Sequence, residues 1–255
     1  TGLDPLDVRK RNLYGRGRDV TPYRQKIEDN IALEVIEALE KSSSYRARRK
    51  KIAAFNRQNT VLKKGIALTP VKFGISFTLT HLNQAGALVH LYIKVAQVVA
   101  EVFGISADMV RITATTTGKV PNTSATAASS GADLNGMAAK IAATTIKARM
   151  VDFAAKEWKV AKSSIKFEKG QVLIGNQRIS FGDLARKVHG GRGSLSSTGF
   201  YSTPKITWDR PNGRGNPFFY FAYGASCSEV TIDTMTGEMR VDRVDILHDV
   251  GRSLN

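Results

Sequence analysis

KVPNTSATAASSGADLNG, residues 119–136, is a long run of small, mostly uncharged residues in a chain that is otherwise strongly basic. The run offers no obvious nucleophile, base or metal ligand. Small side chains let a loop backbone approach a ligand, so that free N–H groups and hydroxyls can bind phosphate or a polar heterocycle. We expect Asp133 to cap a helix that starts here, where orphan N–H groups favour an anion. The alternative is a packing loop between a strand and a helix, and composition alone leaves both open.

Outward from this loop, the hydrophobic pattern alternates between strand and helix. Periodic apolar positions predict helices over residues 1–12 (capped by Asp4), 25–51, 95–102 and 133–158. Segments rich in β-branched and aromatic residues predict strands within 65–80, 86–95, 109–117, 165–170, 171–176, 177–180, 218–233 and 235–251. The last two form a hairpin with Gly237 in its turn, and residues 190–197 form a loop. There is neither a strict βαβ period nor a GxGxxG loop, so we predict an α+β fold with mixed sheets and packed helices.

Composition excludes several classes of protein. The chain has 255 residues, of which 42% are hydrophobic, and no run is long enough to span a bilayer. One cysteine, Cys227, excludes an internal disulfide framework and a cysteine-held cluster, and we expect it to be a small buried residue in a strand. The four histidines form no HxH or HxxxH pair, which gives a protein-ligated metal little support. We expect a cytoplasmic protein.

A net charge of +16 invites a nucleic-acid interpretation. Much of the charge lies in one stretch: Lys41, Arg46, Arg48, Arg49, Lys50, Lys51, Arg57, Lys63 and Lys64. No RNA-binding signature accompanies this stretch, and aromatic residues are not interleaved as a stacking platform requires. We therefore interpret it as a solvated helix face, with a patch for nucleic acid or another anionic partner as the alternative.

Several long motifs together resemble one family. VPNTSATAASSGADLNG resembles the cofactor loop of the molybdenum hydroxylases, in particular the molybdopterin-binding subunit of bacterial xanthine dehydrogenases of the separate-subunit type. The same resemblance, in the same order, extends to DPLDVRKRNLY, KFGISFTLTHLNQAGALVHLY, SLSSTGFYSTPKITW, YGASCSEVTIDTMTGE and HDVGRSLN. It covers nearly the whole chain and implies the α+β molybdenum-binding region of that family, which has two domains.

The resemblance implies roles for two groups of residues. In the TAAS element, Ala127 and Ala128 would lie against the molybdenum, with Ala128 beside the metal, and Ser129 and Ser130 would contact the pterin. In GISFTLTHL, Phe77 would stack on a purine ring and Thr78 would hydrogen-bond it. Leu79 and Leu82 would line the substrate channel. Without the resemblance, Phe77 would be interpreted as a core aromatic.

The implied reaction is hydroxylation of a purine, from hypoxanthine or xanthine to urate, with water as the oxygen source. Electrons would leave through 2Fe–2S clusters and FAD in a partner subunit to NAD. The base of the family is a glutamate in a GEPP-type motif that this sequence does not contain, so we assign no catalytic residue in this chain. Glu229 and Asp249 are carboxylates without a matching motif, and we expect both to be structural.

The resemblance also predicts how the chain is organised. Residues 1–64 would be a helical lead-in that connects the molybdopterin domains, and residues 65–255 would be a molybdopterin-binding region. That region would lack an internal segment after Tyr92, where the family has a turn and a further cofactor loop. Three hypotheses follow. The chain is part of a hydroxylase that works as a hetero-oligomer with an iron–sulfur/FAD subunit; it is an inactive fragment; or it is a basic module that binds nucleic acid or another anionic partner.

Overall fold

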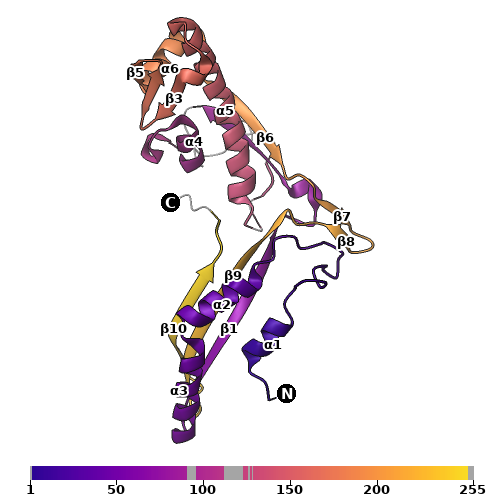
Figure 1. The fold of residues 1–255 in the computed structure, drawn as a ribbon. Coiled ribbons are helices and arrows are strands. Elements are labelled where there is room, and N and C mark those ends of the chain that lie inside the picture. Colours follow the sequence, from indigo (N-terminus) through magenta and orange to yellow (C-terminus); the bar gives the residue numbers. More distant parts are fainter. Residues whose placement is uncertain (1, 91–95, 112–122, 126, 128, 252–255) are drawn as a thin grey trace. The chain divides into compact units, whose positions relative to one another are not determined.

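The computed structural model describes residues 2–90, 96–111, 123–125, 127 and 129–251 (Figure 1). The fold is α+β, as predicted, with helices and several small antiparallel sheets. Two compact units are present: unit 1 is Thr1–Ile75 with Thr207–Asn255, and unit 2 is Ser76–Ile206. The boundary predicted after residue 64 separates a connecting segment from a cofactor-binding region, and it stays a prediction. The compact units instead divide the chain after Ile75 and after Ile206. Among the described residues, no helix has both the length and the apolar character to cross a membrane.

Unit 1 is built on a three-stranded antiparallel sheet in the order β1–β9–β10. The strands are β1 (Leu62–Ile75), β9 (Tyr220–Asp233) and β10 (Met239–His248). β1 continues through Pro70, which an edge strand tolerates because one side of its backbone needs no partner. The predicted hairpin is confirmed as β9–β10, and Gly237 in its turn has φ +78°. A smaller ribbon pairs β7 (Thr207–Asp209) with β8 (Arg214–Asn216).

Three helices cover one face of this sheet: α1 (Pro5–Arg11), α2 (Ala32–Ser42) and α3 (Tyr45–Gln58). The shared core includes Leu6, Ile36, Leu39, Tyr45, Ile66, Leu68, Phe221, Tyr223 and Cys227. Asp4 caps α1 as predicted, since its Oδ1 accepts a hydrogen bond from the Leu6 N–H at 2.8 Å. Cys227 is fully buried in β9, which confirms its predicted place.

The prediction of one helix over residues 25–51 was wrong at its start, in its middle and at its end, since α3 continues to Gln58. The chain breaks at Ser43 and Ser44, where Ser44 has φ +54° and separates α2 from α3. Residues 25–31 are not helical because tertiary hydrogen bonds hold them in an irregular segment with a β-bridge at Lys26. The Ile27 N–H donates to the Asp19 carbonyl, and the Gln25 side chain donates to the Phe218 carbonyl. The apolar residues in this segment have helical spacing, but hydrogen bonds to other parts of unit 1 prevent a helix there.

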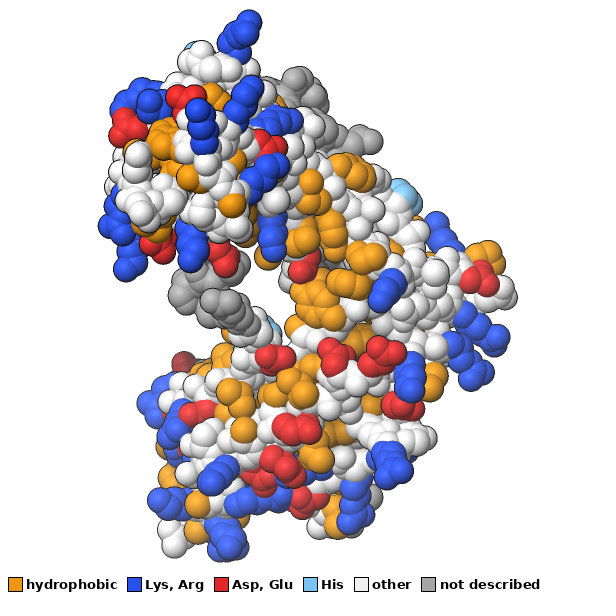
Figure 2. Space-filling model, turned by 45° about the horizontal axis from the view of Figure 1, so that its top comes forward, with side chains coloured by type: hydrophobic (Ala, Val, Ile, Leu, Met, Phe, Trp, Pro, Cys, Tyr) orange, Lys and Arg blue, Asp and Glu red, His pale blue; other side chains and the backbone are white. Residues whose placement is uncertain are grey.

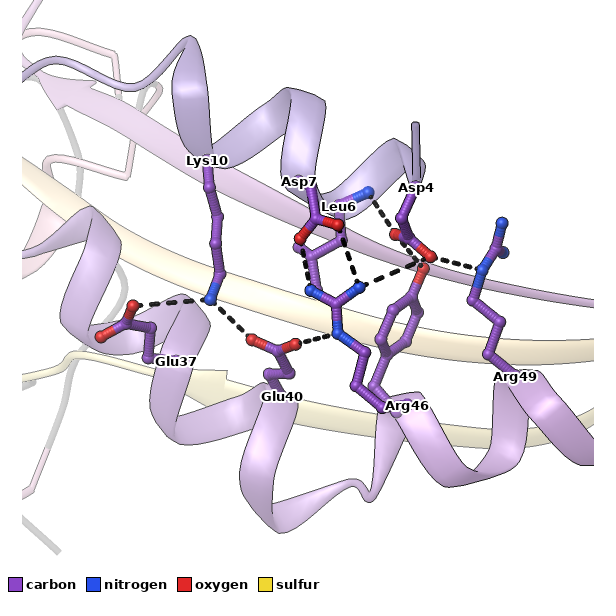
Figure 3. Close-up of polar contacts among 9 residues, drawn as sticks. Asp4, Leu6, Asp7, Lys10, Glu37, Glu40, Arg46 and Arg49 are labelled. Atoms are coloured by element: carbon purple, nitrogen blue, oxygen red, sulfur yellow. Dashed lines mark hydrogen bonds and ion pairs between the residues drawn. The ribbon is translucent and has the colours of Figure 1, made fainter. Parts of the chain in front are cut away.

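The basic stretch of α3 carries ion pairs as well as solvated charges. Seven side chains of α1, α2 and α3 form one cluster (Figure 3): Asp4, Asp7, Lys10, Glu37, Glu40, Arg46 and Arg49. The hydrogen bond to Asp7 raises the pKa of Arg46, and the same bond lowers the pKa of Asp7. On the face shown in Figure 2, Lys and Arg side chains are interspersed with Asp and Glu. Part of the basic run therefore ties α1 to its neighbours.

Unit 2 is built around the long helix α5 (Gly131–Trp158) and a two-stranded ribbon, β2 (Gln84–His90) paired with β6 (Ser196–Ser202). α5 packs across this ribbon at very short range. A Cβ added to Gly199 of β6 would lie 2.1 Å from the Ala138 carbonyl oxygen and 2.7 Å from the Ala142 nitrogen. Small residues on α5 and glycine on β6 therefore allow helix and strand to meet backbone to backbone.

The rest of unit 2 packs on the other parts of α5. It comprises α4 (Ala96–Phe103), the meander β3 (Ile165–Glu168), β4 (Gln171–Ile174) and β5 (Gln177–Ser180), and α6 (Phe181–Gly190). Short 3₁₀ helices are Thr80–Leu82, Ala107–Met109 and Lys162–Ser164. The three strands within 165–180 and the helix over 95–102 are confirmed to within a residue or two. Sequence reasoning missed α6 and β6. Most of the strand predicted over 109–117 lies outside the described residues.

Candidate functional site

The first predicted segment, residues 76–83, forms a compact turn that we call the Phe77 loop. It follows β1 and ends where β2 begins, with the 3₁₀ helix Thr80–Leu82 inside it. Phe77 is half-buried and belongs to none of the hydrophobic clusters of described residues, so it is not the core aromatic that residue type alone suggests. Thr78 and Leu79 are exposed, and Leu82 is half-buried. The loop therefore presents these side chains at the surface of unit 2.

The side chain of Asn83 holds the Phe77 loop closed. Asn83 is 2% exposed, and its Oδ1 accepts a hydrogen bond from the Phe77 N–H at 2.7 Å. Its Nδ2 donates to the Phe77 carbonyl at 2.9 Å and to the Thr80 carbonyl at 3.2 Å. The Asn83 carbonyl in turn accepts from the Thr203 N–H just beyond β6. One buried amide thus satisfies both backbone groups of Phe77.

The second predicted segment leads into α5, and we call its described residues (123–125, 127, 129 and 130) the Ser130 loop. Ala125, Ala127 and Ser129 are exposed, and Ser129 has φ +56°. Ser130 is 2% exposed, and its hydroxyl donates to the Ala127 carbonyl at 2.7 Å. That bond closes the turn before α5 and orients the exposed residues on either side of it.

The two loops meet at the start of β2. The Thr123 hydroxyl accepts from the Gly86 N–H at 3.1 Å and donates to the Gly86 carbonyl at 3.0 Å. The Ser124 N–H donates to the Gln84 carbonyl at 3.2 Å. Residues 83–86 are therefore a shared anchor: Asn83 fixes the Phe77 loop, and Gln84 and Gly86 fix the Ser130 loop.

The N-terminus of α5 differs from the prediction. Ser130, not Asp133, is the N-cap residue, and its side chain makes no capping hydrogen bond to a described residue. Asp133 lies in the first turn, because the helix begins two residues earlier than the apolar pattern indicated. Burial raises the pKa of the Tyr201 phenol on β6, and the negative charge of Asp133 raises it further. The first turn of α5 therefore lies near Tyr201 of β6.

The chemistry of the Ser130 loop suits a polar, anionic heterocycle. Its exposed residues carry small side chains that leave the backbone accessible, and the first turn of α5 provides N–H groups where a negative charge is stabilised. Among the described residues, no group of three or more His, Cys, Asp or Glu side chains could hold a metal. Ala128 lies outside the described residues.

The carboxylates that were expected to be structural are engaged in unit 1. Glu229 on β9 accepts from Arg48 at 2.8 Å, and Arg48 also pairs with Asp245 at 2.7 Å. The Asp249 side chain accepts from the Gly251 N–H at 3.1 Å, as expected for a turn. Both predictions of a structural role agree with these contacts.

Comparison with protein families places the chain. The model of the molybdopterin cofactor-binding domain matches residues 38–94 and 91–255, which together span most of the sequence. The chain belongs to the molybdopterin cofactor-binding domain family. This match is in two segments whose junction lies at residues 91–94.

Curated relatives of this domain are xanthine dehydrogenases. The chain is 40% identical to xanthine dehydrogenase/oxidase of Gallus gallus over 273 aligned positions, which cover 100% of the chain and 19% of the relative. It is 39% identical to the enzyme of Mus musculus and 38% identical to the xanthine dehydrogenase of Dictyostelium discoideum, with the same coverage. The chain therefore spans about a fifth of the length of these relatives.

Solved structures share the fold of this domain. Quinoline 2-oxidoreductase from Pseudomonas putida 86 matches with a TM-score of 0.79 at 20% identity, covering 100% of this chain and 35% of that one. Aldehyde oxidoreductase from Desulfovibrio gigas matches with a TM-score of 0.74 at 20% identity, covering 100% and 27%. At this identity the likeness establishes the architecture alone.

Sequence reasoning singled out both segments but was wrong to extend the strand within 65–80 past Ile75, where β1 ends and the Phe77 loop begins. It also missed the residues that join the two loops: Asn83, Gly86 and Thr123. One weak signal was present, because an asparagine beside a short turn often bonds nearby backbone groups. The bonds between Thr123 and Gly86 link positions 37 residues apart, and nothing local in either segment indicates them.

Proposed function

We propose that this chain is part of the molybdenum-cofactor subunit of a xanthine dehydrogenase-like enzyme that hydroxylates purines. The observation that supports it best is the shared anchor at residues 83–86. Two segments that resemble the family's substrate and cofactor elements, distant in sequence, are tied to the same four residues. The 40% identity to a xanthine dehydrogenase over the whole chain agrees with the proposal.

In this proposal, the Ser130 loop binds the cofactor. Ala127 and Ala128 would lie beside the molybdenum, and Ser129 with Ser130 would offer backbone and hydroxyl groups to the pterin. When bound, the molybdenum cofactor would accept the electrons released as a purine carbon is hydroxylated with oxygen from water. The described part of this chain contributes no base, and the base would belong to another part of a longer polypeptide.

The Phe77 loop would bind the substrate. The ring of Phe77 offers a stacking surface for a flat purine, and such contacts contribute about 1–3 kcal/mol per base. Thr78 is exposed beside it and would hydrogen-bond the purine through its backbone or hydroxyl, with Leu79 and Leu82 lining the approach. These residues orient a purine and exclude water from one of its faces.

We further infer that the natural polypeptide contains residues after Tyr92 that are absent from this sequence. The family model matches in two segments that join at residues 91–94, and the alignment with the chicken relative runs over 273 positions against 255 residues here. A subunit or domain with 2Fe–2S clusters and FAD would pass the electrons on to NAD.

The test uses the full-length polypeptide that contains this segment, purified with its electron-transfer partner. Urate formation from xanthine in ¹⁸O-labelled water, with NAD as acceptor, should place the label in the product, and metal analysis should find molybdenum. The variant Phe77→Ala should raise the KM for xanthine about 10- to 100-fold through the lost stacking. Phe200→Ala, at a half-exposed phenylalanine of β6, is the matched control. A protein with bound molybdenum that leaves xanthine, hypoxanthine and other purines unchanged would refute the proposal.

A further inference from the structure

The Phe77 loop begins in a conformation that needs external support. Ser76 has φ +147°, which residues other than glycine rarely adopt, and it is only 5% exposed. Immediately after it, the backbone N–H and carbonyl of Phe77 both face the buried amide of Asn83. A strained backbone persists only where its surroundings hold it, and the Asn83 amide holds the residue that directly follows the strained one.

The same residue lies where the second loop is attached. The Asn83 backbone bonds to Thr203 beyond β6, and Gln84 and Gly86 carry the bonds to Ser124 and Thr123. Ala85, between them, is 1% exposed and packs on Leu134 of α5. Asn83 therefore fixes the Phe77 loop to the part of unit 2 that also carries the Ser130 loop and the start of α5.

We propose that Asn83 is a positioning residue that sets the orientation of Phe77 and Thr78 toward a bound purine. This rests on the proposed function of the Phe77 loop. Removal of the amide leaves the N–H and carbonyl of Phe77 without these bonds, whereas the Thr80 carbonyl keeps its bond from the Asn83 backbone N–H, so that the loop relaxes around Phe77. Because a misplacement of about 1 Å is enough to lower catalytic efficiency about 100-fold, the effect on substrate is large.

The experiment compares Asn83→Ala with Asn56→Ala in the full-length enzyme with its electron-transfer partner. Asn56 is a matched control, because its side chain also bridges the N–H and the carbonyl of one residue, Lys64, at 2.8 Å each, in unit 1. Both variants should unfold at a lower temperature than wild type and retain molybdenum. Only Asn83→Ala should lower kcat/KM for xanthine, by about 10- to 100-fold, with most of the change in KM.

Two results would overturn the proposal: an unchanged KM in Asn83→Ala, or an equal change in both variants, which would mean general destabilisation. Hydrogen exchange on the wild type gives a measurement that does not need the variant to fold. The Phe77 amide should be strongly protected relative to that of exposed Thr78, and rapid exchange at Phe77 would contradict the role of Asn83. A wild-type enzyme that hydroxylates no purine would instead refute the proposed function, and the substrate-orienting role of Asn83 would fail with it even if Phe77 is protected.

Discussion

Substitution of Gly199 by alanine tests the central packing contact of unit 2. Gly199 on β6 faces α5 so closely that an added Cβ would lie 2.1 Å from the Ala138 carbonyl oxygen and 2.7 Å from the Ala142 nitrogen. Both are backbone atoms of a helix, which cannot rotate away as a flexible side chain can. To reach an ordinary separation of about 3.5 Å, helix and strand must part by roughly 1 Å.

The expected cost follows from that displacement. Overpacking of a well-packed core costs about 1–3 kcal/mol, and a clash with helix backbone belongs at the upper end. The alanine also makes the unfolded chain less flexible, which offsets about 0.4–1 kcal/mol. We therefore expect Gly199→Ala to lower the free energy of unfolding by about 2–3 kcal/mol. Because β6 pairs with β2, the displacement should also disturb the anchor at residues 83–86.

Urea unfolding followed by far-UV circular dichroism measures this effect, with Gly190→Ala as the control. Gly190 is the last residue of α6, and a Cβ added there would meet no neighbouring atom within 4 Å, so alanine should be neutral or stabilise by up to about 1 kcal/mol. Hydrogen exchange on the same variants should show the Ser124 amide exchanging faster in Gly199→Ala. If the two alanine variants unfold within about 0.5 kcal/mol of each other, β6 and α5 do not meet backbone to backbone.

Three further outcomes are expected. Arg48→Met leaves the largely buried carboxylates of Glu229 and Asp245 without their shared partner and should lower the free energy of unfolding by about 3 kcal/mol, measured in urea. The control Arg186→Ala breaks an exposed pair with Asp183 and should change that free energy by less than about 0.5 kcal/mol. Hydrogen bonds from Thr231, Lys64 and Arg240 lower the pKa of Asp242 below its usual 3.8, so the ionised carboxylate stabilises the fold above that pH and this stabilisation is lost as the pH falls below it. Asp242→Asn should therefore weaken the dependence of the free energy of unfolding on pH in acid, and an unchanged dependence would contradict this. Burial raises the pKa of Tyr223 to about 12, and its hydroxyl has no partner among the described residues, so Tyr223→Phe should be neutral or stabilising near pH 7 and should remove one late step from the ultraviolet phenolate titration.

Much of the fold could be predicted because local pattern and tertiary structure agree. The meander over residues 165–180 and the hairpin around Gly237 follow from alternation and turn residues. The helix predicted over 25–51 failed because residues 25–31 bond to distant parts of unit 1, which a periodic pattern cannot report. β6 was missed because its sequence, SSTGFYS, combines strand-forming Thr198, Phe200 and Tyr201 with three serines and a glycine, which are typical of loops. Its glycine is explained by the approach of α5, a constraint that exists only in three dimensions.

The site could be predicted only in part. The family resemblance indicated the residues that we propose to face a ligand, but not those that hold them. Asn83 and Thr123 act through bonds to backbone groups, and side chains that bond to backbone can do so in many sequence contexts, so no motif identifies them. Charge had little predictive value here, since many of the basic residues that gave the chain its net charge of +16 are spread over helices far from both loops in sequence.

Exposure separates the two explanations of the small-residue run that composition left open. A loop that serves only to pack a strand against a helix would bury its small residues, as α5 buries Ala138 and Ala142. In the Ser130 loop the division is different: Ser130 is buried and closes the turn, while Ala125 and Ala127 are exposed. Small apolar residues at the surface contribute little to packing and leave room for a ligand, and the adjoining helix start has no side-chain cap from a described residue. The geometry thus favours a binding loop whose own closure is provided by Ser130.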